Sequence, residues 1–171
     1  MVNTLTACDW PGGCGGEPDS DGAGIASRYQ EVVRSSTDMG RVLDAIIAAM
    51  TGAGHTGKDA FAVRLALEEA IINAHKHGHC GAWGLPIVVR GRVGAGGVVV
   101  QVEDQGPGFD LGQVPDPTAP ENLERSSGRG LLRMRAYMTR VCHSRRGNGV
   151  CLCRGRSPAG PGVAVFEGDR P

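Results

Sequence analysis

The sequence lacks an excess of charge of either sign, a long apolar run and a secretory leader. Its 171 residues carry 18 acidic and 18 basic side chains, so the formal net charge is zero. Domains that bind nucleic acid are usually basic, and we therefore expect no nucleic-acid partner. No stretch approaches the roughly 18 consecutive apolar residues of a membrane-spanning helix. The first residues lack the charged and apolar regions of a secretory signal, so we expect a cytoplasmic protein with no membrane partner.

The six cysteines lack the spacing of a zinc site. Zinc sites usually contain closely spaced Cys pairs, and Cys8 and Cys14 are too far apart to form one. Cys151 and Cys153 alternate along a predicted strand, so both should face the same side of a sheet. Because cytosolic thiols usually stay reduced, we expect these residues to be thiols with no structural metal.

Both ends of the chain are poor in large apolar residues and rich in Gly, Pro and Ser. A chain of this length suits one domain. We predict that domain over residues 28–154, between a disordered tail at 1–26 and a flexible tail at 155–171. Residues 106–127 contain four prolines and no periodicity, and loops of this length are usually functional, for example as lids.

Apolar spacing within the domain predicts both helices and strands. Thr56 is expected to cap the central helix, which contains no Gly or Pro from Ala60 to His77. The other predicted helices are 38–51 and 128–138, and the predicted strands are 28–35, 86–93, 98–104, 140–144 and 149–153.

Two polar residues lie at the edge of the apolar face of the central helix. Glu69 and Asn73 are four residues apart, so they lie one above the other on the helix. An Asn carbonyl oxygen suits Mg²⁺, and a Glu carboxylate can accept a proton from a nucleophile. This pair is compatible with a catalytic site and also with two polar residues that have no function.

Two glycine-containing segments complete the pattern. Asp104 ends a predicted strand just before Gly106-Pro-Gly108, and Gly128-Arg-Gly130 begins a predicted helix. An Asp at a strand end can accept a hydrogen bond from an exocyclic amino group such as that of adenine. Glycines allow the backbone to approach a ligand closely, and the N–H groups at a helix N-terminus can bind phosphate. Together with the helix, these segments indicate a nucleotide site.

The three motifs resemble those of the GHKL (Bergerat-fold) ATPases, which include the histidine kinase-like ATPase domains. Glu69-Ala-Ile-Ile-Asn73-Ala-His-Lys-His77 resembles their N box, Glu-Asp104-Gln-Gly106-Pro-Gly108 their DxGxG box, and Ser127-Gly128-Arg-Gly130-Leu131 their second glycine box. The resemblance covers roughly residues 28–154. It implies an α+β fold, a two-layer α/β sandwich whose mixed, mostly antiparallel sheet is covered by helices on one face. ATP would lie between the helical layer and the lid.

Within this superfamily, residues 128–138 are most similar to the anti-sigma-factor serine/threonine kinases. The resemblance implies transfer of the ATP γ-phosphate to a Ser or Thr of an anti-anti-sigma (STAS) partner, alternating with binding of a sigma factor, and it suggests a homodimer. Glu69 would be the general base, Asn73 the Mg²⁺ ligand and Asp104 the residue that recognises adenine. The other residues that the resemblance places at the nucleotide are Lys76, His77, Gly106, Gly108, Gly128, Arg129, Gly130 and Leu131.

Two departures from the family pattern leave alternatives open. Val150 stands where family members often place a Thr that helps to bind adenine, and Thr139-Arg140 stands where anti-sigma kinases usually have an acidic residue. The first alternative is an ATP-gated module that binds a protein without phosphotransfer. The second is a stand-alone ATP domain of a phosphorelay.

Overall fold

One sheet forms the base of the molecule. The computed structural model describes residues 7–8, 25–108 and 129–157. The last strand of the described chain, β6, lies between β5 and β4, because the strand order is β1-β5-β6-β4-β3-β2. All neighbours pair antiparallel except β1 and β5. The strands are β1 (Ala7–Cys8), β2 (Ile25–Val33), β3 (Ile87–Gly94), β4 (Gly97–Glu103), β5 (Arg140–Ser144) and β6 (Gly149–Gly155).

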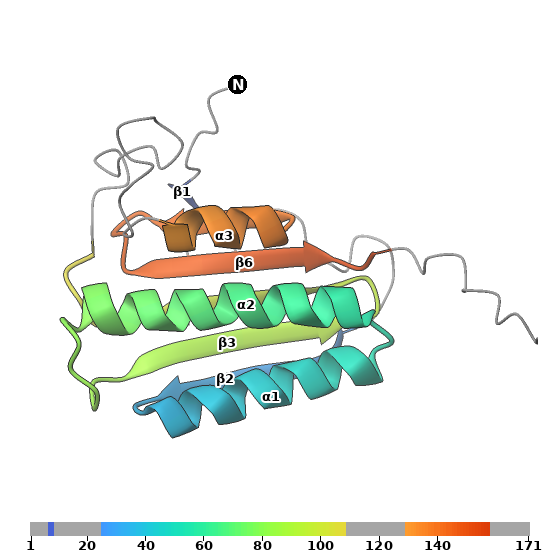
Figure 1. Ribbon diagram of the computed structural model, residues 1–171, viewed down its shortest axis with the longest axis horizontal. Helices are drawn as coiled ribbons and strands as arrows, with labels where there is room; N and C mark the ends of the chain where they lie inside the picture. Colours follow the sequence, from blue (N-terminus) through green and yellow to red (C-terminus); the bar gives the residue numbers. More distant parts are fainter. Residues whose placement is uncertain (1–6, 9–24, 109–128, 158–171) are drawn as a thin grey trace, which may run out of the picture.

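Three helices lie on one face of this sheet (Figure 1). They are α1 (Ser36–Gly52), α2 (Gly57–Asn73) and α3 (Arg129–Tyr137). The arrangement confirms the predicted α+β sandwich with a mixed, mostly antiparallel sheet. Within the described ranges, no helix is both long enough and apolar enough to cross a membrane.

Side-chain caps explain where the first two helices begin. The Ser35 hydroxyl accepts a hydrogen bond from the Asp38 amide at 3.1 Å, and the Thr56 hydroxyl accepts one from the Asp59 amide at 3.1 Å. Each cap satisfies one of the N–H groups that have no partner within the helix. The prediction that Thr56 caps the central helix is therefore confirmed.

The central helix changes form before it ends. The α-helical hydrogen bonding of α2 gives way to a π-helical turn, η1 (Ala74–Gly78). Such wide turns are rare and occur frequently at functional sites. The predicted element therefore has the expected length, but its last five residues have a different geometry.

The core lies between the helices and the sheet. Ile46 and Met50 of α1 and Leu67 and Ile71 of α2 are at most 1 % exposed. They pack against strand side chains that alternate between the two faces, such as Val89, which is fully buried. Complete burial of one such side chain contributes roughly 1.5–3 kcal/mol, so this layer fixes the position of α2 on the sheet.

The opposite face of the sheet carries a small second cluster. Val99, Cys142 and Cys151 are buried there, with Cys153 packed beside them. None of these three cysteines forms a disulfide, and neither does Cys80. Within the described ranges, no group of three or more His, Cys, Asp or Glu side chains could hold a metal ion.

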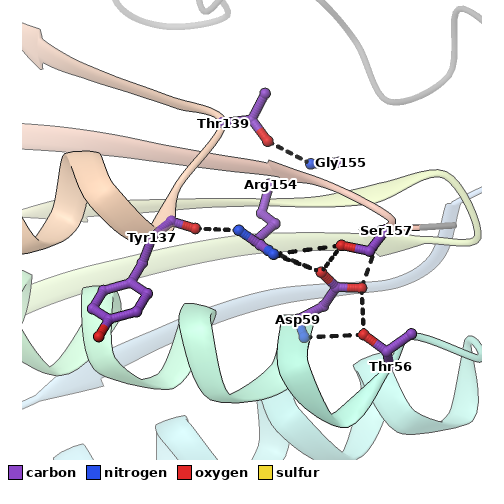
Figure 2. A network of polar contacts seen from close by, with 7 residues as sticks. All are labelled: Thr56, Asp59, Tyr137, Thr139, Arg154, Gly155 and Ser157. Carbon is purple, nitrogen blue, oxygen red and sulfur yellow. Dashed lines mark hydrogen bonds and ion pairs between the residues drawn. The ribbon is translucent and has the colours of Figure 1, made fainter. Parts of the chain in front are cut away.

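A buried carboxylate connects two helices at one end of the helical layer. Asp59, in the first turn of α2, is fully buried and accepts hydrogen bonds from Arg154 at 3.0 Å and from the Ser157 hydroxyl at 2.7 Å (Figure 2). Thr56 donates to the same carboxylate at 2.8 Å. Arg154 also donates to the carbonyl of Tyr137, the last residue of α3. The network therefore joins the start of α2, the end of α3 and the end of β6.

The same network sets the ionisation of Asp59. Burial is the largest single influence and opposes ionisation, but the hydrogen bonds from Ser157, Thr56 and Arg154 together outweigh it. The pKa of Asp59 therefore lies well below its usual range, and the carboxylate is ionised at neutral pH.

Candidate nucleotide-binding site

A cavity of about 360 Å³ opens between the helical layer and the ends of the central strands. Its apolar lining includes Val102 of β4, Met134 of α3 and Val150 of β6. Polar side chains from η1, α2 and the loop after β4 also line it. Six of the residues predicted at the nucleotide line this cavity, namely Asn73, His77, Asp104, Gly108, Gly130 and Leu131.

Asp104 is held rigidly at one side of the cavity. Its side chain accepts a hydrogen bond from the Gly106 amide at 2.7 Å. Its backbone N–H donates to the Asn148 carbonyl, and the Asn148 amide donates to the Asp104 carbonyl, both at 2.9 Å. Burial raises the pKa of Asp104 above its ordinary value. A carboxylate can accept several hydrogen bonds at once, so Asp104 can also accept one from a ligand amino group.

Close backbone approach explains the glycines around Asp104. A Cβ at Gly78 would overlap the Asp104 carboxylate, and a Cβ at Gly106 would overlap the Gly78 carbonyl oxygen. Gly108 has a φ of +79°, and a Cβ there would overlap the Arg146 carbonyl. Only glycine has no Cβ and adopts such a φ readily, so the DxGxG segment packs in a way that any other residue would disturb.

Glu69, Asn73 and Gly130 meet at a second place beside the cavity. A Cβ at Gly130 would lie 2.5 Å from Glu69 Oε2 and 3.2 Å from Asn73 Nδ2. The first turn of α3 therefore rests directly on the two polar residues of α2. Arg133, also on α3, donates from Nη1 to Glu69 Oε1 at 2.6 Å. The predicted catalytic residue thus lies at the contact between the two helices.

The π-helical turn completes the site. His77 and Gly78 of η1 line the cavity. His79, just after the turn, is 4 % exposed, and its Nε2 accepts a hydrogen bond from the Gln105 amide at 3.1 Å. This bond ties the end of the turn to the loop that follows Asp104. Lys76 is exposed and does not line the cavity, so the structure does not bring it together with the other predicted residues.

Some predicted positions fall outside the described residues. The structure does not describe Gly128 or residues 109–127 of the predicted lid, and it describes only the backbone of Arg129.

The sequence analysis assigns no role in the site to two of its residues, His143 and Asn148. His143 of β5 lines the cavity, and burial, with a smaller contribution from Arg135, lowers its pKa to about 4. It is therefore neutral at pH 7. Asn148 lies between the predicted strands 140–144 and 149–153, and its side chain connects Ser144 to Asp104. Strand alternation within 140–144 could have placed His143 on the side of the helices, whereas nothing in the sequence indicates the role of Asn148.

The model of the histidine kinase-like ATPase domain family matches residues 33–154, which is more than two thirds of the chain. The chain belongs to this family. A comparison with curated proteins found no match. Membership supports a GHKL-type domain with ATP as its ligand, and Asp104 and Gly108 of the predicted DxGxG box line the cavity.

The residues present fit ATP and its metal. Asp104 and Gly130 both line the cavity, so a base can reach the Asp104 carboxylate and phosphates can approach the first turn of α3. Mg²⁺ in nucleotide sites is usually held by one or two protein ligands, phosphates and water. Asn73 can supply one such ligand, and a cluster of three acidic ligands is not required.

Proposed function

We propose that this histidine kinase-like ATPase domain is a protein serine/threonine kinase of the anti-sigma type. The observation that carries the proposal is the position of Glu69. Its carboxylate lies against Gly130 at the start of α3 and beside Asn73. A carboxylate next to a helix N-terminus that can bind phosphate is well placed to orient an incoming hydroxyl group.

The proposed chemistry uses both sides of the cavity. Asp104 accepts a hydrogen bond from the adenine amino group, and the phosphates lie towards the first turn of α3, where Asn73 would hold Mg²⁺. The oxygen of a substrate hydroxyl attacks the γ-phosphorus atom while the bond to the ADP oxygen breaks. Glu69 orients this hydroxyl and takes its proton. Most of the catalysis in phosphoryl transfer comes from such positioning and from neutralisation of charge.

The partner class comes from the sequence resemblance of residues 128–138. On that basis the hydroxyl belongs to a Ser or Thr of a STAS-type anti-anti-sigma protein, and a sigma factor is the alternative binding partner. The same resemblance suggests a homodimer and a cytoplasmic location. These points belong to the proposal and are testable separately from ATP binding.

The test is transfer of ³²P from γ-labelled ATP to candidate STAS proteins, with Glu69→Gln as the variant. We expect the variant to lose phosphotransfer. Its affinity for ATP, measured by calorimetry, should stay within about twofold of that of the wild type, since Glu69 acts on the substrate hydroxyl and not on adenine. Glu68→Gln is the matched control, because it makes the same change one residue away and about 100° around the helix. Full transfer by Glu69→Gln would reject the role of Glu69.

The alternatives give different results in the same assay. Binding of a partner that depends on ATP, with no labelled product, favours a gated binding module. A labelled product that is labile in acid favours phosphohistidine and therefore a phosphorelay domain. Acid-stable phosphoserine or phosphothreonine supports the proposed kinase.

A further inference from the structure

The ion pair between Glu69 and Arg133 connects the predicted base to α3. Arg133 lies one helical turn after Gly130, and its Nη1 is 2.6 Å from Glu69 Oε1. The Arg133 side chain is 60 % exposed and that of Glu69 is 21 % exposed. An ion pair this exposed adds little to stability, typically about 0–1 kcal/mol. Its location suggests a different role.

We propose that Arg133 is a positioning residue that fixes the Glu69 carboxylate for phosphotransfer, an inference that rests on the proposed function. The two oxygens of Glu69 are both in contact with α3. Oε2 lies so close to the Gly130 backbone that a Cβ at this position would be only 2.5 Å away. Oε1 accepts the hydrogen bond from Arg133. A Glu side chain has three rotatable bonds, so a contact at each oxygen removes much of its freedom.

Hydrogen bonds between two charged groups are shorter and stronger than neutral ones. The 2.6 Å separation fits this class. Because phosphoryl transfer depends mainly on positioning, a carboxylate that samples several rotamers should orient the substrate hydroxyl poorly. A misplacement of about 1 Å can cost roughly 100-fold in rate.

Charge gives a second reason for an arginine at this position. Glu69 and the γ-phosphate are both anionic, and in the proposed arrangement they lie close together. Asn73, one turn farther along α2, is neutral and cannot offset their repulsion. The guanidinium of Arg133 places a positive charge directly beside the carboxylate, so the base can remain close to the phosphate.

The test compares Arg133→Met, which keeps much of the length of the side chain without its charge, with Arg133→Lys. We expect Arg133→Met to lower kcat for phosphotransfer about tenfold or more, because the base loses its fixed position. The KM for ATP and the calorimetric affinity for ATP should stay within about twofold. Arg133→Lys should recover part of the lost rate, since an ammonium group keeps the charge but not the geometry of a guanidinium.

Two controls separate positioning from a structural role. Arg64→Met breaks a comparable exposed ion pair on α2, in which Arg64 contacts Asp44 at 2.8 Å, and should leave kcat unchanged. In a Glu69→Gln background, the Arg133→Met change should not lower the residual kcat for phosphotransfer any further, because Arg133 acts through Glu69.

Several results would overturn the inference. They are a kcat for Arg133→Met equal to that of the wild type, a rise in KM with unchanged kcat, or a loss that adds fully to that of Glu69→Gln. A wild-type chain that binds ATP but transfers no phosphate would instead refute the proposed function, and the positioning role with it.

Discussion

Replacing Asp59 by Ala should destabilise the domain far more than any exposed acidic substitution. The carboxylate is fully buried, and the Arg154 side chain that it binds is only 17 % exposed. Without Asp59 the guanidinium remains buried without its counter-charge, and the hydroxyls of Thr56 and Ser157 lose their acceptor. Removing one partner of a buried ion pair typically costs about 3–5 kcal/mol.

Thermal unfolding followed by circular dichroism measures this effect. For a domain of this size, 1 kcal/mol corresponds to roughly 3–4 °C in Tm, so we expect Asp59→Ala to lower Tm by about 10 °C or more. Asp44→Ala is the matched control, because the Asp44 side chain is 70 % exposed in its pair with Arg64. That change should cost no more than about 1 kcal/mol.

Acid provides a second readout of the same network. Because folding lowers the pKa of Asp59, its contribution is fully present above the unfolded value of about 3.9 and is lost as pH falls below it. The gap in stability between the wild type and Asp59→Ala should therefore narrow below about pH 4. Equal Tm values for Asp59→Ala and Asp44→Ala at neutral pH would refute the reasoning.

Three further predictions concern the ATP site. Gly130→Ala should lower the rate of phosphotransfer, because its Cβ would lie 2.5 Å from Glu69 Oε2, and a faster Gly130→Ala enzyme would contradict this packing. Gly40→Ala is the control: its Cβ would meet no atom within 4 Å, so this change within a helix should raise Tm slightly. Asp104→Ala should weaken ATP binding at least tenfold in calorimetry, since a bond to a charged acceptor contributes about 1.5–3 kcal/mol, and unchanged affinity would exclude Asp104 as the residue that recognises adenine. Folding lowers the pKa of His143 from 6.5 to about 4, so the free energy of unfolding should fall by roughly 3 kcal/mol as the pH is lowered from 6.5 towards 4. A His143→Gln variant with the same fall in stability over this window would exclude His143 as its source.

Local patterns in the sequence were sufficient for most of the secondary structure. The cap at Thr56, the helix that carries Glu69 and Asn73, and the strand that ends before Asp104 all depend on neighbouring residues. Their spacing therefore predicted them within a few positions. All three motifs supply residues that line the cavity, namely Asn73 and His77, Asp104 and Gly108, and Gly130 and Leu131.

Contacts between distant parts of the chain could not be predicted in the same way. Asp59 and Arg154 are 95 residues apart, and no periodicity connects them. The ion pair between Arg133 and Glu69 could not be predicted either, since nothing in a helical pattern shows which acidic group lies opposite on a neighbouring helix. The π-helical turn depends on backbone geometry, which the side-chain pattern of residues 74–78 does not reveal.

The place of β6 in the sheet has a consequence for synthesis on the ribosome. β6 is the last strand of the described chain, yet it lies between β4 and β5. Until Gly149–Gly155 has left the ribosome, β4 has a neighbour on only one side, and its run of valines at 98–100 forms an open edge. Open apolar edges favour association with other chains. A nascent or truncated chain is therefore exposed to aggregation, and it lacks Gly149 and Val150, which line the cavity.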